Sequence, residues 1–226
     1  MAKRHETHPQ AQVRINSPEH QTFVDSLRHC DLTVVVGPAG TGKTFLSLAV
    51  ALELLQERQI DSIYVVRRIT PTFNEDLGAL PGDLLDKFIP FAGGTFDTLS
   101  QLIPRPLLYQ YLQEGVLQFL PVSWTRGRTF IRSFVLVDEV QQFSPEMVLC
   151  VLTRFGRGSK MVLAGDPQQS DLGYLGGLEF ARYIAEGIKS ASYIEFTNHH
   201  VERHPLVRQI LHRANSWITP NLPHSP

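Results

Sequence analysis

The fold of this chain is decided by residues 32–44, which read Leu32-Thr-Val-Val-Val-Gly-Pro-Ala-Gly-Thr-Gly-Lys-Thr44. The first five, Leu32–Val36, are apolar or β-branched, which is typical of a central strand in a parallel sheet. The next eight, Gly37–Thr44, have the spacing Gly-x4-Gly-Lys-Thr of a phosphate-binding loop. From Phe45 to Leu55 the apolar residues recur at helical spacing. A strand, this loop and a helix in this order predict an α/β fold whose loop binds nucleotide phosphates.

Each residue type in the loop has a chemical reason to be there. Glycines let backbone N–H groups turn inward around phosphate oxygens, at a helix N-terminus whose dipole favours anions. We expect Lys43 to reach the β- and γ-phosphates and the Thr44 hydroxyl to ligate Mg²⁺. The predicted nucleotide-binding residues are Gly37, Pro38, Ala39, Gly40, Thr41, Gly42, Lys43 and Thr44.

Two further apolar strands lead to polar residues that suit hydrolysis. Asp138 and Glu139 follow the run Phe134–Val137, and a parallel sheet would place them beside the phosphate loop. We expect Asp138 to hold Mg²⁺ through its water shell and Glu139 to orient or deprotonate the attacking water. Gln169 follows the run Met161–Ala164, and its neutral amide suits sensing the γ-phosphate or holding the lytic water, with Gln168 as the second candidate. A glutamate beside the metal-binding aspartate favours an ATP hydrolase over a kinase, which must exclude water.

Composition and charge narrow the class of protein. The chain has 226 residues, enough for one well-packed domain, with 42% hydrophobic and 19% charged residues. Its net charge of −1 provides no global attraction to nucleic acid or membrane, so polyanion binding would need a local patch. The two cysteines, Cys30 and Cys150, are too few for a disulfide framework, and no secretory signal or membrane span is visible. We expect a cytoplasmic protein that does not contact a membrane.

Strand-like and helix-like segments alternate along the chain, which predicts a three-layer fold with a mostly parallel central sheet. Strands are expected at 32–36, 62–66, 116–120, 133–137, 160–164 and 192–196. Helices are expected at 17–29, 43–57, 95–103, 106–114, 144–155, 177–187 and 205–216. We expect a single domain over 17–218 that contains an irregular, proline-rich insert at 67–116, with a flexible leader at 1–16 and a disordered tail at 219–226.

Several motifs taken together resemble the PhoH family of ATPases. They are the phosphate loop, Asp-Glu-Val-Gln-Gln at 138–142, the segment 158–172 and Val-Glu-Arg-His-Pro-Leu-Val at 201–207. That family is similar in its core to the motor domain of superfamily 1 helicases. The resemblance runs from about residue 17 to residue 212, and it implies a P-loop NTPase with a RecA/superfamily 1 helicase-like core.

The resemblance implies roles for further residues. Gln21 matches a glutamine that contacts adenine, and Gln141 matches one that links the nucleotide site to moving parts. Because the chain holds one motor-like core, Arg203 or Arg128 is expected to act across a subunit interface in a homo-oligomer, as in a hexameric ring. The alternative for Gln21 is an ordinary surface residue, and for each arginine a surface ion pair.

Nucleic-acid binding is the least determined expectation. Basic residues at strand ends and loops are interleaved with aromatic ones, a pattern that suits a single strand held by phosphate contacts and stacking. They are Arg67, Arg68, Arg126, Arg128, Arg132, Arg154, Arg157 and Lys160, with Phe73, Trp124 and Phe130. The alternative is solvated basic residues beside core aromatics.

The sequence thus predicts a Mg²⁺-dependent ATPase that couples ATP turnover to binding or remodelling RNA or single-stranded DNA. Two other classes stay open: a nucleotide-gated ring assembly or scaffold with little turnover, and a P-loop kinase of a small metabolite.

Overall fold

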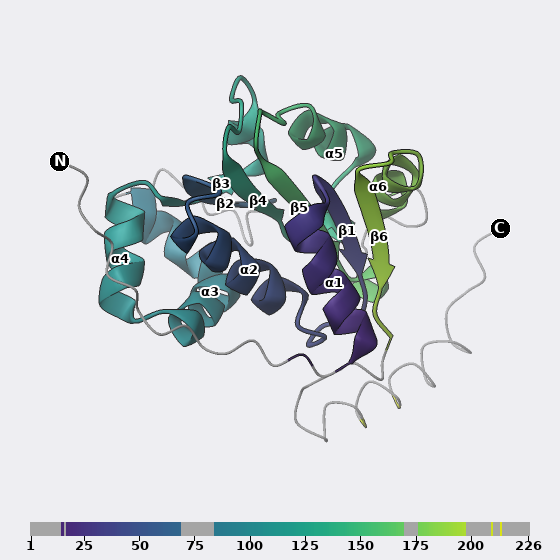
Figure 1. Ribbon diagram of the computed structural model, residues 1–226, viewed down its shortest axis with the longest axis horizontal. Helices are drawn as coiled ribbons and strands as arrows, with labels where there is room; N and C mark the ends of the chain where they lie inside the picture. The colour runs from purple at the N-terminus through teal and green to yellow at the C-terminus, as the bar shows by residue number, and fades with distance from the viewer. Residues whose placement is uncertain are drawn as a thin grey trace.

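A six-stranded parallel sheet with helices on both faces forms the centre of the protein (Figure 1). The computed structural model describes residues 17–68, 84–169 and 176–197, together with Ile15, Gln209 and Arg213, and for 84–92 it describes the backbone alone. The strands are β1 Leu32–Val36, β2 Ser62–Arg67, β3 Leu117–Pro121, β4 Ser133–Val137, β5 Lys160–Gly165 and β6 Ala191–Glu195, in the order β3-β2-β4-β5-β1-β6.

The helices lie between these strands along the chain. The α-helices are α1 Pro18–His29, α2 Lys43–Gln56, α3 Leu84–Leu102, α4 Arg105–Gln113, α5 Pro145–Leu152 and α6 Gly177–Glu186. Short 3-10 helices are η2 Val122–Thr125, η3 Val140–Gln142 and η4 Pro167–Gln169. Of the helices in the described ranges, none is both long and apolar enough to cross a bilayer.

Side chains alternate across the sheet and so divide the core into two clusters. In β1, Val35 packs with α1 to α4 on one face, whereas Val34 and Val36 pack with α5 and α6 on the other. Figure 1 shows the same division, with α1 and α2 on one side of the sheet and α5 and α6 on the other. All five residues of β1 are buried, as are all five of β4, which explains their near-continuous apolar sequence. The predicted three-layer α/β fold is confirmed.

Helix starts follow the capping rules that the sequence suggests. The Ser17 hydroxyl accepts a hydrogen bond from the His20 backbone N–H at 3.2 Å, and Pro18 occupies the first turn of α1. Ser144 caps α5 in the same way, through the Met147 N–H at 3.4 Å. The predicted starts of both helices are therefore correct.

Helix α3 is longer than the sequence predicts. It begins at Leu84 rather than near residue 95, and it continues through Pro90 and the pair Gly93-Gly94. Proline and glycine disfavour a helix locally, but packing of the apolar side chains Phe96, Leu99 and Leu102 against the core offsets that penalty. The predicted leader, tail and helix 205–216 lie outside the described residues, apart from Ile15, Gln209 and Arg213.

Substitution of Gly156 is expected to destabilise the fold, because this glycine packs directly against another segment of backbone. The segment 130–132 runs beside the end of α5, where Phe130 and Phe155 form a parallel bridge, and a Cβ at Gly156 would lie 2.2 Å from the Phe130 carbonyl oxygen. We expect Gly156→Ala to lower the free energy of unfolding by about 2–3 kcal/mol, because the backbone at Phe130 would have to move to make room for the new methyl group. Urea unfolding checks this. Gly187→Ala is the control, since its nearest atoms would lie 3.7 Å away, and equal stability of the two variants would contradict the prediction.

Candidate functional site

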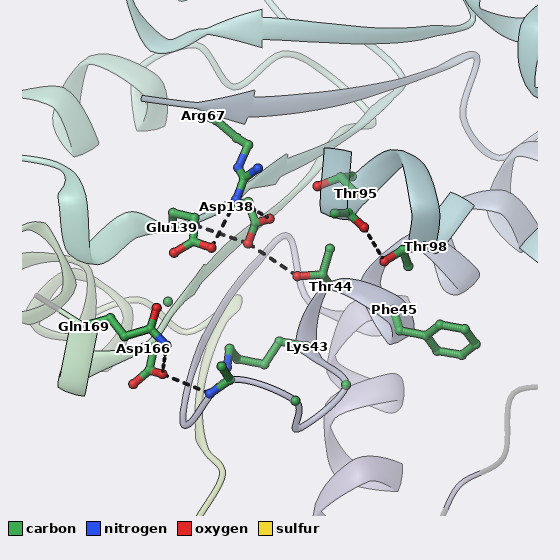
Figure 2. A pocket seen from close by; sticks show the side chains of 15 residues that line it. Lys43, Thr44, Phe45, Arg67, Thr95, Thr98, Asp138, Glu139, Asp166 and Gln169 are labelled. Atoms are coloured by element: carbon green, nitrogen blue, oxygen red, sulfur yellow. Dashed lines mark hydrogen bonds and ion pairs between the residues drawn. The ribbon is translucent and has the colours of Figure 1, made fainter. Parts of the chain in front are cut away.

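A cleft of about 300 Å³ opens where the carboxyl ends of four strands meet (Figure 2). Since the sheet is parallel, the segments after β1, β2, β4 and β5 all reach this edge, and residues of α3 also line the cleft. The lining residues are Ala39, Gly40, Gly42, Lys43, Thr44, Phe45, Arg67, Gly94, Thr95, Thr98, Asp138, Glu139, Gly165, Asp166 and Gln169.

The phosphate loop has the backbone that its glycines allow. Gly40 and Gly42 have φ values of 85° and 82°, in the left-handed region that favours glycine, and Gly42 precedes the first turn of α2. A Cβ at Gly37 would lie 2.6 Å from the Phe196 carbonyl oxygen, so this position also requires glycine. The Lys43 ammonium lies over the loop and donates to the carbonyls of Gly37 at 2.5 Å and Pro38 at 2.9 Å. The loop therefore presents a cation and a helix N-terminus to the cleft.

Thr44 and Asp138 face each other across the cleft floor. The Thr44 hydroxyl donates to Asp138 Oδ1 at 3.4 Å, and the Glu139 backbone N–H donates to the same oxygen at 3.2 Å. The Arg67 guanidinium lies 3.7 Å from Asp138 Oδ2. A hydroxyl and a carboxylate that converge in this way are the hard oxygen donors that Mg²⁺ prefers, so these two residues fit the metal that the sequence predicts.

Glu139 is held by partners on both of its oxygens. Arg67 donates to Oε1 at 3.1 Å, and the Gln141 side-chain amide donates to Oε2. The backbone of Glu139 has φ +60°, a left-handed conformation uncommon outside glycine, asparagine and aspartate. Strained backbone that persists at a cleft is a feature of functional sites, because surrounding contacts must hold it.

Asp166, at the end of β5, connects the loop to Gln169 and was not predicted from the sequence. Its Oδ2 accepts from the Ala39 backbone N–H and from the Gln169 amide, both at 2.9 Å. Its own N–H donates to Gln141 Oε1 at 3.0 Å, and Gln141 is only 1% exposed. Hydrogen bonds therefore run from Glu139 through Gln141 and Asp166 to the phosphate loop. The sequence signal was a carboxylate directly after a buried strand in Gly165-Asp166.

Other predicted site residues lie away from the cleft. Gln21 is exposed on α1, where its amide donates to Asp25 Oδ1 at 2.8 Å, and it is not a lining residue. Arg128 is exposed beside β3, with its guanidinium 3.5 Å from the Gln118 side-chain oxygen. Pro38 and Thr41 are buried residues of the loop that do not line the cleft, and the Thr41 hydroxyl donates to the Pro38 carbonyl. Arg203 lies outside the described residues.

The predicted nucleic-acid groove needs correction. Phe130 is 2% exposed and packs against Tyr64 with ring centroids 4.8 Å apart, so it cannot stack on a base. Arg132 is paired with Asp61 at 2.8 Å, and Arg67 faces the cleft carboxylates. Phe73 lies outside the described residues. Among the aromatic candidates that are described, Trp124 remains accessible at 46% exposure.

Because Asp138 is buried, it is expected to make the free energy of unfolding depend on pH. Burial raises the pKa of Asp138, against the opposing attraction of Arg67. The carboxyl therefore contributes stability below its unfolded pKa of about 3.9, and this contribution is lost as pH rises through the folded pKa. Asp138→Asn removes the buried charge, so without Mg²⁺ we expect it to raise the free energy of unfolding at neutral pH by about 1–2 kcal/mol.

Thermal unfolding from about pH 4 to about pH 8 measures this effect. Asp61→Asn is a control of opposite sign, because the hydrogen bond from Arg132 lowers the pKa of Asp61. Its stabilising contribution is present above the unfolded pKa and is lost as pH falls. An Asp138→Asn protein no more stable than the wild type near neutral pH would contradict the prediction.

Comparisons with known proteins identify relatives of this chain. The sequence profile of the family described as PhoH-like protein matches residues 12–215. The PhoH-like protein of Bacillus subtilis is 35% identical over 201 residues, which cover 88% of this chain and 63% of that protein. Protein PhoH2 of Mycolicibacterium smegmatis is 35% identical over 215 residues, 92% of this chain and 49% of that protein. This chain therefore spans less than two-thirds of the length of these relatives.

Among solved structures, the Pif1 helicase from Candida albicans is 17% identical, with a TM-score of 0.44 over 93% of this chain and 46% of that chain. A similarity at this level is too low to bear on function. The family profile, by contrast, spans nearly the whole chain. With 35% identity to its relatives, this match shows that the chain belongs to the PhoH-like protein family.

Proposed function

We propose that this protein is a Mg²⁺-dependent ATP hydrolase. The observation that carries the proposal is the convergence of Lys43, Asp138 and Glu139 in one cleft, with Thr44 and Gln169 also in its lining. A cation and loop amides suit a phosphate chain, a hydroxyl and a carboxylate suit the metal, and a second carboxylate suits activation of water.

Different residues of the cleft would bind the phosphates and the metal. The loop N–H groups and Lys43 would bind the β- and γ-phosphates, for which the ammonium must turn from the Gly37 and Pro38 carbonyls toward the cleft. Thr44 and Asp138 would hold Mg²⁺, which would neutralise negative charge on the phosphates.

The general base in this proposal is Glu139. In the proposed step its carboxylate takes a proton from a water that attacks the γ-phosphorus, while the bond from the γ-phosphorus to the β-phosphate oxygen breaks to give ADP and phosphate. Arg67 and Gln141 orient the carboxylate through their hydrogen bonds. Gln169, held by Asp166, would position the water or contact the γ-phosphate.

Phosphate release in the absence of any acceptor tests this proposal. The hydrolase is expected to release phosphate from ATP with Mg²⁺ alone. Release that requires a hydroxylated metabolite would favour the kinase, and ATP binding without release would favour the nucleotide-gated scaffold. Either result would overturn the hydrolase.

We further propose that turnover is coupled to RNA or single-stranded DNA. The support is a surface strip in which the exposed Trp124, Arg126 and Arg128 follow β3. An exposed indole beside guanidinium groups suits stacking and phosphate contact. Phosphate release is measured with and without each polymer, for the wild type, Trp124→Ala and the control Tyr183→Ala, whose aromatic side chain is 74% exposed on α6. No stimulation by either polymer would refute the coupling and leave the ATPase intact.

The ring remains part of this proposal. Arg128 is exposed and does not line the cleft of its own chain, which suits a role in the cleft of a neighbouring subunit, and Arg203 is the second candidate. Turnover per chain is expected to fall when the protein is diluted to monomers, as followed by light scattering. Full turnover by the monomer would exclude an arginine acting in trans.

A further inference from the structure

The nucleotide cleft has two chemically different ends. Ionised and amide side chains gather at one end, where Asp166 and Gln169 lie beyond Lys43 (Figure 2). At the other end the lining residues that the structure describes carry no charge. They are Phe45 in the first turn of α2 and Gly94, Thr95 and Thr98 on α3. A nucleotide has the same division, with a polyanionic phosphate chain and an uncharged nucleoside.

The order of residues fixes which way a nucleotide would lie. Glu139 and Gln169 suit the γ-phosphate, and Thr44 suits the metal. Phe45 follows Thr44 directly along α2, so a phosphate chain that begins near Gln169 and passes Thr44 reaches Phe45 at its α-phosphate end. Figure 2 shows Phe45 and Thr98 together on the side of Thr44 opposite Gln169.

We propose that Phe45 and α3 form the subsite for the nucleoside, its ribose and base, an inference that rests on the proposed ATP-binding function. The Phe45 ring is half-buried and offers an apolar face to a sugar or base. The Thr98 hydroxyl donates to the Gly94 carbonyl at 2.8 Å, which leaves its oxygen free to accept from a ribose hydroxyl. In this proposal α3 contacts the uncharged nucleoside end of the ligand.

Among the described residues, Gly94 leaves open space beside the cleft. A Cβ at this position would have no described atom within 4 Å, although Gly94 lines the cleft. Within the part of the chain that the structure describes, the neighbouring Gly93 also has no atom within 4 Å of its Cβ position, and it is not a lining residue. The two glycines therefore form a matched pair, of which one faces the ligand. A larger side chain at either position also raises helix propensity, so neither substitution should unfold α3.

Calorimetric binding of ATP and of inorganic tripolyphosphate, each with Mg²⁺, tests the subsite in Gly94→Leu and Gly93→Leu. We expect Gly94→Leu to weaken ATP binding by about tenfold or more and to leave tripolyphosphate binding unchanged. Gly93→Leu is expected to bind both ligands as the wild type does. Phe45→Ala is a second variant, expected to weaken ATP selectively as well.

Three results would overturn the subsite. Unchanged ATP affinity in Gly94→Leu would show that the nucleoside lies elsewhere, and selective loss of ATP from Gln21→Ala would place it at α1. Equal loss of ATP and tripolyphosphate from Gly94→Leu would assign α3 to the phosphates instead. Failure of the proposed hydrolase is distinguishable, because it would be seen in the wild type as ATP binding without phosphate release.

Discussion

Glu139→Gln is expected to abolish phosphate release while ATP binding is kept. Glutamine has the shape of glutamate but cannot take a proton from water, so turnover should fall by about 10³-fold. The substitution also places an amide between two donors, Arg67 and Gln141, which now contact the carboxylate oxygens. One of these hydrogen bonds must be lost, which loosens the side chain further. Single-turnover phosphate release and calorimetric ATP affinity separate the two effects.

Glu195→Gln is the matched control for this variant. Glu195 also ends a parallel strand, β6, but it lies outside the cleft lining, so turnover should stay at the wild-type level. A Glu139→Gln protein that releases phosphate at a rate near the wild type would remove Glu139 as general base. Loss of ATP affinity would instead give it a role in binding.

Lys43→Ala is expected to lose ATP binding and, with it, turnover. The ammonium is the one cation in the loop, and a charge-assisted contact to phosphate is worth more than a neutral hydrogen bond. Its removal also leaves the Gly37 and Pro38 carbonyls without the donor that now satisfies them. We expect ATP affinity to fall by about 100-fold or more, as measured by calorimetry.

Lys160→Ala is the control for Lys43→Ala. It shows whether removing any lysine that donates to a backbone carbonyl weakens ATP binding. Lys160 also donates to a backbone carbonyl, that of Cys30 at 2.9 Å, but it begins β5 at the opposite edge of the sheet. Its ATP affinity should match the wild type. Should Lys43→Ala bind ATP as tightly as Lys160→Ala does, the loop would not be the phosphate site.

The phosphate loop and the acidic pair could be located from the sequence because short-range patterns carry them. A buried strand needs apolar residues, the loop needs glycines with left-handed backbone, and Asp138-Glu139 must emerge where β4 ends. In a parallel sheet all strand ends meet at one edge, so these groups had to lie near one another. The structure places them in one cleft.

The ion pair between Arg67 and Glu139 could not be predicted from a local sequence pattern. In the sequence it is one of several basic residues near a proposed nucleic-acid path, yet in the structure it pairs with Glu139. The pairing arises because β2 lies beside β4 in the sheet, with Val66 aligned to Val137. Strand order is decided by packing over the whole domain, and no periodicity in residues 62–67 encodes it.

The sequence also did not predict that α3 lines the cleft, for a similar reason. Pro90 and the pair Gly93-Gly94 are typical of a break, so the sequence predicts irregular chain up to residue 95. Burial of Leu99 and Leu102 supports a helix through these residues instead. Gly94 consequently lines the cleft, which a propensity argument cannot reveal.

The strand that carries the phosphate loop has neighbours that come late in the chain. β1 pairs with β5 on one side and β6 on the other, so Leu32 aligns with Met161 and with Ala191. During synthesis both edges of β1 must therefore wait for more than half of the chain, with apolar strand residues unpaired in the meantime. N-terminal fragments that end before β5 are thus expected neither to fold nor to bind ATP.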